Sequence, residues 1–261
     1  MRRALFVVVG LVLLLGGALA LLKLATFNQE KQDFAVIEKH RAAAAKQLDR
    51  VRSLADVVRA QGPLDADTVN IPLSGVTFVD LSGAPPPNGA FVRAELLTEE
   101  GYRDDFDGDD FTFDRSPFWG RCGAWLETGK NPDGTPPKFA NVIEDELRAF
   151  ELVRYVGVLR PLELVKPERR DDSTFAPGHF RYEVLFYELS DKPRLLGGLR
   201  LEGKNDETVR VKYHEKTRAF DEMEWLRRNL RMRAYEALFT AMQKASPNTK
   251  LHPPSFFAPD V

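Results

Sequence analysis

A dense group of carboxylates between residues 104 and 114 is the feature of this sequence with the clearest chemical potential. Five aspartates fall within residues 104–110, and Asp114 follows shortly after. Such side chains repel one another at neutral pH unless a cation or basic groups screen them. Hard carboxylate oxygens on a glycine-containing loop are the ligands that Ca²⁺ prefers. Four of these side chains are therefore candidate calcium ligands: Asp105, Asp107, Asp109 and Asp110.

The spacing of these aspartates does not match the EF-hand calcium loop. Asp105, Asp107 and Asp109 fit the first three ligand positions, but the turn glycine is displaced and Ser116 stands where the pattern needs Glu. Three interleaved phenylalanines indicate a loop with some side chains anchored in the core: Phe106, Phe111 and Phe113. We interpret the segment first as a solvated acidic loop. A calcium site and a surface for a basic partner are the alternatives, and no other cofactor is predicted.

No catalytic residue can be assigned from the sequence. Residues 123–131 resemble a phosphate-binding loop only superficially, because the glycine spacing is one residue too long and Asn131 replaces the Ser or Thr that binds Mg²⁺. Cys122 lies between two tryptophans and is interpreted as a small buried hydrophobic residue, with His179 or His214 as the base if it were a nucleophile. Carboxylate pairs for hydrolysis depend on the fold, so a hydrolase stays as an alternative.

The whole-chain composition predicts an ordered globular protein without disulfides. The 261 residues include 37 basic and 39 acidic side chains, so the net charge of -2 argues against a nucleic acid as partner. The chain is 43% hydrophobic, unlike disordered proteins, and its one cysteine cannot form an intramolecular disulfide. Acidic residues are concentrated in residues 61–150, where 17 accompany 7 basic ones.

An uncharged run from Ala4 to Leu22 follows Arg2 and Arg3. Nineteen apolar residues in a helix match the thickness of a bilayer, so residues 1–25 are predicted to be an uncleaved membrane anchor that binds the membrane through residues 4–22. The arginine pair favours an exported body, in the periplasm or another extracytoplasmic compartment. The alternatives are a body that faces the cytoplasm and a signal peptide that is cleaved to release a secreted protein.

Residues 26–61 are predicted to form a juxtamembrane amphipathic helix. Residues 26–59 contain no Gly or Pro, and apolar residues recur at heptad spacing from Phe34 to Val58, with Arg41 as the misfit. Such a seam either packs against the chain's own domain or pairs two or more copies as a coiled coil through residues 34–58. Gly62 and Pro63 end the helix.

The body, residues 62–245, is predicted to be an antiparallel sheet covered by a C-terminal helix. Turn signals separate the expected elements, which include a hairpin around the turn Asn131–Gly134 because Pro132 and Gly134 suit a type I turn. Short connections after residues 189 and 202 require antiparallel neighbours. The expected strands are 68–81, 90–97, 123–128, 135–139, 152–159, 180–189, 194–202 and 208–214, and the expected helices are 140–150 and 221–242.

The predicted fold class is therefore α+β, with an N-terminal transmembrane helix, an amphipathic helix and an antiparallel body. Asp221 and Glu224 have the spacing of a capping box at the start of the last helix. Residues 246–261 form a proline-rich tail. The expected function is that of an anchored envelope scaffold that binds a protein partner without catalysis. A membrane-anchored envelope hydrolase and a calcium-stabilised binding module are the alternatives.

Overall fold

The four-stranded mixed sheet at the centre of the molecule has the strand order β1-β2-β5-β6, and two short strands, β3 and β4, pair separately. The computed structural model describes residues 2–78, 87–98, 117–171, 174–209 and 218–251, and within these it leaves out the side chains of residues 2–26, 96, 98, 117–119 and 218–221. The elements are α1 (Arg2–Ala60), β1 (Gly89–Arg93), α2 (Ala94–Thr98), α3 (Pro117–Thr128), α4 (Ala140–Leu152), β2 (Tyr155–Val165), β3 (Glu168–Arg169), β4 (Phe175–Ala176), β5 (His179–Glu188), β6 (Arg194–Lys204) and α5 (Arg218–Ala245).

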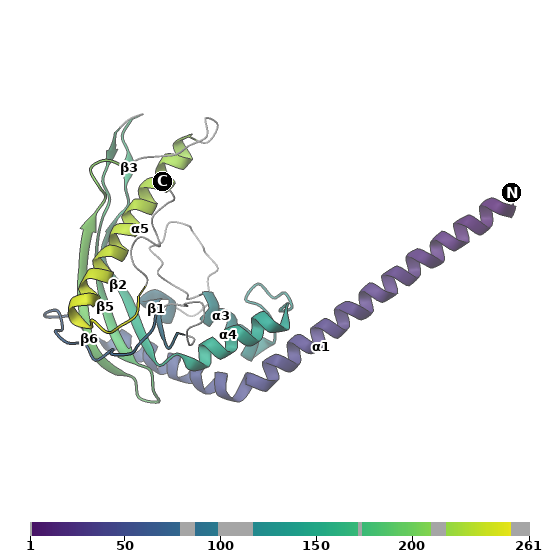
Figure 1. Ribbon diagram of the computed structural model, residues 1–261, viewed down its shortest axis with the longest axis horizontal. Coiled ribbons are helices and arrows are strands. Elements are labelled where there is room, and N and C mark those ends of the chain that lie inside the picture. The colour runs from purple at the N-terminus through teal and green to yellow at the C-terminus, as the bar shows by residue number, and fades with distance from the viewer. Residues whose placement is uncertain (1, 79–86, 99–116, 172–173, 210–217, 252–261) are drawn as a thin grey trace.

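Two apolar cores lie on opposite faces of this sheet. Because side chains alternate along a strand, β5 directs Tyr182 and Val184 into one core and Leu185 and Tyr187 into the other. The first core contains the inner face of α5, and the second contains α1, α3 and α4. Figure 1 shows α5 lying along the sheet, with α1 and α4 at the lower end. The sheet is thus the middle layer between helices.

The predicted all-antiparallel sheet is wrong at one edge. β2, β5 and β6 form the expected antiparallel meander, but β1 pairs with β2 in parallel, with Gly89 opposite Tyr155. A parallel pair needs a crossover connection, and here the chain between the two strands includes α2, α3 and α4. The expected strand 90–97 is accordingly cut short at Arg93, where α2 begins.

The strand predicted over residues 68–81 does not form in its described part. Asn70 and Gly75 have φ angles of 62° and 78°, which an extended ladder cannot accommodate, and Pro72 lacks a backbone N–H. Only an isolated bridge forms there, between Thr77 and Lys250. Residues 79–81 lie outside the described residues, and so do residues 210–214 of the strand expected at 208–214.

The two strands of the hairpin predicted around Asn131–Gly134 do not form, but the predicted turn between them does. Gly134 N–H donates to Asn131 O at 2.9 Å, and Gly134 has a φ of 81°. The preceding segment is helix α3, because Cys122, Trp125 and Leu126 are all buried and have the spacing of one helical face. The segment after the turn leads into α4 without forming a strand.

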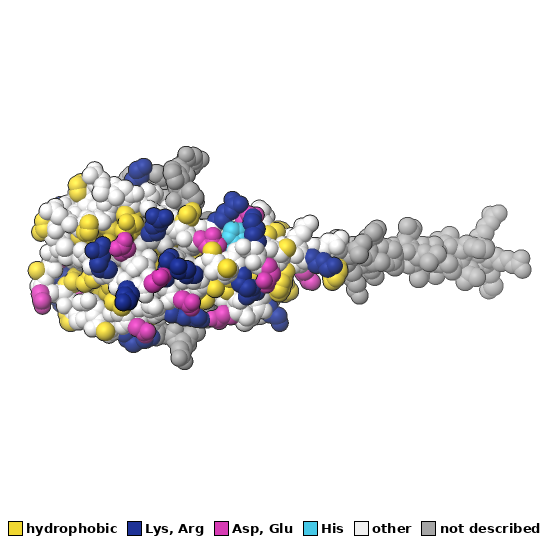
Figure 2. Space-filling model, turned by 90° about the horizontal axis from the view of Figure 1, so that it is seen from below, with side chains coloured by type: hydrophobic (Ala, Val, Ile, Leu, Met, Phe, Trp, Pro, Cys, Tyr) yellow, Lys and Arg dark blue, Asp and Glu magenta, His cyan; other side chains and the backbone are white. Residues whose placement is uncertain are grey.

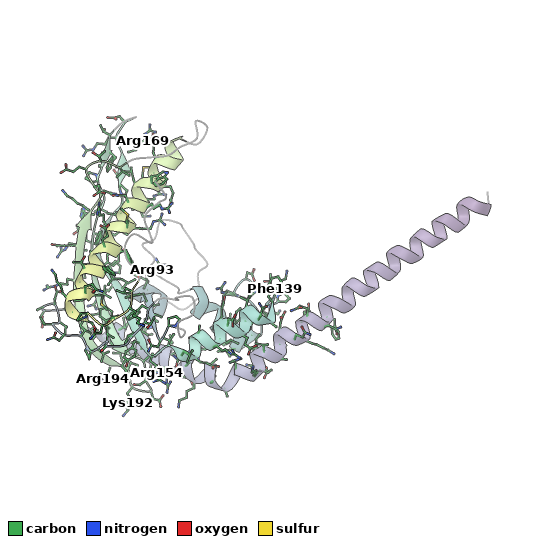
Figure 3. All side chains as sticks on the ribbon, in the orientation of Figure 1. Arg93, Phe139, Arg154, Arg169, Lys192 and Arg194 are labelled. Carbon is green, nitrogen blue, oxygen red and sulfur yellow. The ribbon has the colours of Figure 1, made fainter. Side chains whose placement is uncertain are left out.

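The residue before α4 is conformationally unusual. Phe139 has a φ of 68° and is 65% exposed, although it is a bulky residue that rarely adopts a left-handed conformation. Figure 3 shows Phe139 at the end of the body where α1 leaves it. The α4 helix itself matches the prediction and buries Ile143, Leu147 and Phe150.

The C-terminal helix α5 is also confirmed, with a corrected start. It begins at Arg218, so Asp221 lies within its first turn rather than at its cap. Its apolar stripe packs on the sheet through Leu230, Leu238 and Met242. After the helix, the predicted tail first runs back across the body, where Lys250 N–H donates to Val76 O at 2.9 Å. Residues 252–261 of the tail lie outside the described residues.

The heptad seam of α1 is occupied by the chain's own body. Ile37 and Ala44 are fully buried, and Val58 is 4% exposed, in the core that α1 shares with α3 and α4, whereas Phe34 at the start of the seam is 48% exposed. Gln47 fixes the helix further by donating to Val153 O at 2.6 Å. The intramolecular alternative for the seam therefore describes this structure, while pairing of two copies through residues 34–58 stays a prediction.

The predicted transmembrane helix is contradicted. Among the described residues, no helix is long and apolar enough to cross a membrane. The expected anchor is not a separate element, because α1 runs without interruption from Arg2 to Ala60. The part of α1 whose side chains are described, from Phe27 onward, carries charged side chains at short intervals and packs into a protein core. The side chains of residues 4–22 lie outside the description.

Candidate functional site: a groove beside an edge strand

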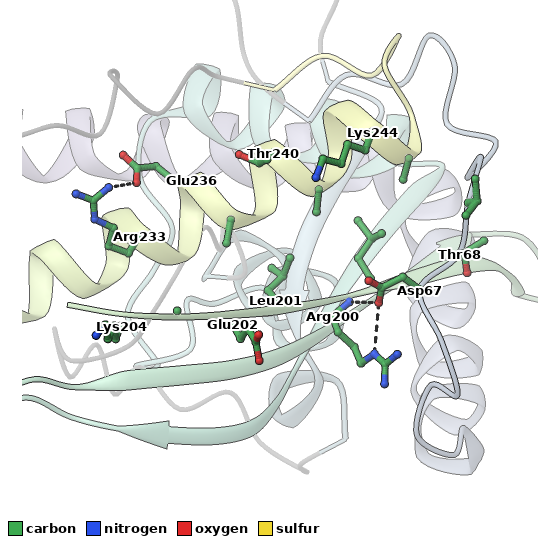
Figure 4. Close-up of a pocket in the computed structure, with 16 residues that line it drawn as sticks. Asp67, Thr68, Arg200, Leu201, Glu202, Lys204, Arg233, Glu236, Thr240 and Lys244 are labelled. Atoms are coloured by element: carbon green, nitrogen blue, oxygen red, sulfur yellow. Dashed lines mark hydrogen bonds and ion pairs between the residues drawn. The ribbon is translucent and has the colours of Figure 1, made fainter. Parts of the chain in front are cut away.

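A groove of about 640 Å³ lies between β6 and α5. Figure 4 shows it from the side, with the helix above the strand and the loop residues Asp67 and Thr68 at one end. Leu201 contributes to its floor, and Ala237 and Ala241 contribute to its helical wall. Small side chains on that wall leave space between helix and strand, so the groove follows from the sequence of α5.

β6 is the last strand of the described sheet, so among the described residues one of its sides has no neighbouring strand. Loop residues cover the start of this edge. Thr68 N–H donates to Gly198 O at 2.8 Å, Gly198 N–H donates to the Thr68 hydroxyl at 2.9 Å, and Arg200 N–H donates to Asp67 Oδ1 at 2.8 Å. These three bonds show that the backbone of Gly198 and Arg200 points away from β5.

The same alternation leaves the end of the edge without a partner in the part of the chain that the structure describes. In an antiparallel pair the N–H and C=O of one residue point to the same side, and successive residues point to opposite sides. The register with β5 continues without a shift from Gly198 to Lys204. Glu202 and Lys204 therefore also direct their backbone N–H and C=O groups outward, and no described residue pairs with them. Unpaired backbone groups of this kind are a template for an added strand.

Charged side chains border the groove, and most are already in ion pairs. Arg200 pairs with Asp67, at 3.4 Å between Nε and Oδ1, and Arg233 pairs with Asp206 and with Glu236. The hydrogen bond from Arg233 is the main cause that lowers the pKa of Asp206, and the same bond raises the pKa of Arg233. These pairs hold the rim in one arrangement at neutral pH.

Two lysines on the rim differ from the arginines. Lys204 lies near one end of the groove and Lys244 near the other (Figure 4), and in the described part of the chain neither ammonium group has an ion-pair partner. Glu202 lies on β6, two residues before Lys204, and is exposed. The basic side chains that line the groove are Arg200, Lys204, Arg233 and Lys244, and the acidic ones are Asp67, Glu202 and Glu236. Of the lining residues without an ion-pair partner in the described part of the chain, two are basic and one, Glu202, is acidic, so their summed charge is positive.

A buried polar network sets the distance between α5 and β6. Asn205, which follows the strand and is 2% exposed, accepts a hydrogen bond from Gly178 N–H at 2.9 Å and donates to Leu226 O at 2.8 Å. Its amide also donates to Asn229 Oδ1 at 3.0 Å. Because this residue joins β5, β6 and α5, it positions both walls of the groove.

The predicted metal ligands are not tested by this geometry. Asp105, Asp107, Asp109 and Asp110 all lie outside the described residues. Within the described part of the chain, no three His, Cys, Asp or Glu side chains gather in a way that could hold a metal ion.

The surroundings of Cys122 do not favour the thiolate form that a nucleophile needs. It is fully buried, and desolvation raises the pKa of its thiol well above the ordinary value, with the negative charge of Glu146 acting in the same direction. Of the two histidines considered as its base, His179 lies on β5 and interacts with Glu163 at 3.1 Å, and His214 lies outside the described residues. Cys122 therefore acts as a core residue of α3.

Comparison of the chain with protein-family models, with curated proteins and with solved structures finds no significant match. Interpretation of the groove therefore depends on its own geometry. Sequence reasoning missed this site, because which strand forms the edge is decided by the whole sheet. The one available signal was the alternation of Leu199 and Leu201 with Arg200, Glu202 and Lys204, which marks a strand with one polar face.

Proposed function

We propose that this protein binds a protein partner, without catalysis, by adding an extended segment of that partner to the open edge of β6. The observation that carries the proposal is the outward-facing backbone of Glu202 and Lys204 beside a groove of about 640 Å³. Addition of a strand to an exposed sheet edge is a common mode of peptide recognition, in which main-chain hydrogen bonds give affinity and the adjoining groove gives selectivity.

The rim charges favour an acidic segment. Lys204 and Lys244 lie at the two ends of the groove, so acidic side chains near both ends of a bound segment would pair with them. Small or β-branched side chains in the middle would fit against Ala237 and Ala241. Two carboxylates at the rim, Asp67 and Glu236, form ion pairs with arginines. Carboxylates held in such pairs suit recognition of a partner better than proton transfer.

The test starts from a phage-displayed library of twelve-residue peptides selected on the full chain. The enriched peptide is then synthesised with a fluorescent label and titrated by anisotropy. We expect enrichment of Asp and Glu, and we expect Glu202→Pro to weaken binding at least about tenfold because it removes an outward N–H. A bulkier groove wall, in Ala237→Leu, gives an independent loss of affinity.

The matched control is Glu202→Ala, which removes the side chain but keeps the backbone N–H. It should bind within about twofold of the unmodified protein, a difference of about 0.4 kcal/mol. Thermal unfolding verifies that each variant is folded. Equal affinity of a selected peptide for the unmodified protein, Glu202→Pro and Ala237→Leu would show that the edge of β6 is not the binding site.

A further inference from the structure

A second, smaller pocket lies away from the β6 groove, where α1 passes the C-terminal end of α3. Its volume is about 300 Å³. Glu30, Asp33 and Phe34 line it from α1, and Lys130, Pro136 and Pro137 line it from the segment that follows α3. The body thus closes against the helix here without filling the space between them.

Asp33 is the unusual residue in this pocket. It is 1% exposed, and its Oδ1 atom accepts a hydrogen bond from Gln29 Nε2 at 3.0 Å. Its Oδ2 atom is buried and has no hydrogen-bond partner among the described residues. A buried carboxylate is costly unless a donor or an opposite charge compensates it. The wall of the pocket therefore contains a buried acceptor whose partner the described chain does not supply.

The other walls favour an organic cation. Glu30 adds a second carboxylate, and the C-terminal end of α3 carries the negative pole of that helix. Phe34 adds an aromatic surface to the pocket, and aromatic faces attract cations. Pro136 and Pro137 add apolar surface suited to an alkyl chain. Calcium, in contrast, takes six to eight oxygen ligands.

The close contact between Phe34 and the chain after α3 depends on a glycine. Gly129 has a φ of 68°, and a Cβ atom at this position would lie 2.7 Å from the Phe34 ring. Gly129 N–H donates to Trp125 O at 3.0 Å, which holds the turn at the end of the helix. The absence of a side chain at Gly129 therefore allows the wall of the pocket to lie close to the Phe34 ring.

We propose that this pocket binds the ammonium group of a small alkylammonium ligand. The ammonium donates to Asp33 Oδ2, the Phe34 ring stabilises its charge, and the alkyl chain contacts the two prolines. Lys130 is exposed and lines the same pocket, so its own ammonium competes for the site from within the chain.

The test titrates the full chain with n-butylammonium chloride and follows the backbone amide signals of Gly129 and Lys130 by NMR. We expect saturable shifts with a Kd on the order of 1 mM, which is typical of so small a ligand. Asp33→Asn should weaken binding at least about tenfold, and Phe34→Leu about threefold. Lys130→Met should strengthen binding, because it removes the competing cation.

The controls separate charge from shape and from metal binding. Neutral n-butanol and equal concentrations of KCl should leave the two amide signals unshifted, and Asp49→Asn, an exposed change on the same helix, should bind as the unmodified protein does. Equal shifts with n-butanol would overturn the proposal, and so would saturable shifts with CaCl₂ but not with n-butylammonium. If Asp33→Asn does not fold, unchanged affinity in both Phe34→Leu and Lys130→Met would also overturn it.

Discussion

Tyr187 shows how one buried hydroxyl couples this fold to pH. The residue is fully buried on β5, facing the core that contains α1 and α4, and its hydroxyl has no hydrogen-bond partner among the described residues. Burial raises the pKa of Tyr187 to about 12, against a smaller opposite effect of Arg160. The folded protein therefore keeps the phenol protonated at a pH where the unfolded chain releases the proton.

We predict that this tyrosine makes the protein sensitive to alkaline pH. The unfolded chain loses the Tyr187 proton from about pH 10 and the folded chain only near pH 12, so the free energy of unfolding falls as the pH rises through this range. Tyr187→Phe should remove up to about 2 kcal/mol of that fall. At pH 7 it should be neutral or stabilising by about 0.5–1 kcal/mol, because an unsatisfied buried hydroxyl is removed.

Urea unfolding at pH 7, 10 and 11.5 measures the effect. Tyr155→Phe, at a partly buried position on β2, serves as the matched control and should follow the profile of the unmodified protein. Parallel losses of stability in Tyr187→Phe and in the unmodified protein would contradict the prediction.

At the scale of elements, the contact between β6 and α5 depends on a single asparagine. Asn205→Ala would leave Gly178 N–H without its buried acceptor and would remove the additional hydrogen bond to the carbonyl of Leu226 in α5. An unsatisfied buried group costs about 1–3 kcal/mol and a lost hydrogen bond about 0.5–1.5 kcal/mol, so we expect a loss of about 2–4 kcal/mol in the free energy of unfolding. Because the same residue positions both walls of the groove, peptide affinity should fall as well.

Chemical denaturation and peptide titration on the same sample measure both effects. Gln243→Ala, on the exposed face of the same helix, should change stability by less than about 0.5 kcal/mol and leave affinity unchanged. Equal stability of Asn205→Ala and the unmodified protein would show that Asn205 does not hold the helix on the sheet.

The elements that the sequence predicted correctly are those with a local cause. α4 and α5 have apolar stripes of helical period, and β5 and β6 alternate around a connection of only five residues. The parallel pairing of β1 could not be predicted, because its partner β2 comes after three intervening helices. α3 was mistaken for a strand because only burial of Cys122 and Trp125 reveals its helical face.

For the whole molecule, the second half of α1 is part of the body rather than an appendage to it. Figure 2 shows the surface seen from below in the view of Figure 1, where basic and acidic side chains are interspersed. Ion pairs such as Lys39 with Glu144, at 2.7 Å, connect α1 to α4. Beneath them, Ile37, Leu54 and Val58 are buried in the common core.

We therefore predict that α1 and the body unfold in a single transition. Leu54→Ala should lower the free energy of unfolding by about 2–5 kcal/mol, because it creates a cavity between α1 and its neighbours. The control Leu162→Ala removes a side chain that is 46% exposed and should cost less than about 1 kcal/mol.

The measurement is denaturant unfolding at two protein concentrations, followed by circular dichroism and by tryptophan fluorescence. The two probes should give one midpoint, and that midpoint should not depend on concentration if the seam is buried within one chain. A midpoint that rises with protein concentration would instead favour pairing of two copies through residues 34–58.

The two proposed binding sites could not have been predicted from the sequence. Asp33 is one acidic residue among many on a polar helix. It lines a pocket only because the turn after α3, almost a hundred residues further along the chain, lies beside it. The groove depends on which strand is left at the edge of the sheet. Export of the body, the calcium ligands and a hydrolytic activity stay predictions.

The return of the chain after α5 has a consequence for biosynthesis. Ile71 N–H donates to Ala245 O, and Lys250 pairs with Thr77, so the first loop of the body is completed by the last described residues. At about 5–20 residues per second, a ribosome needs several seconds to make the chain from β6 to this point. During that interval Phe180, Tyr182 and Phe186 lack their helical cover. We expect the nascent chain to depend on chaperones in this window, and transcripts that end before α5 to yield aggregating products.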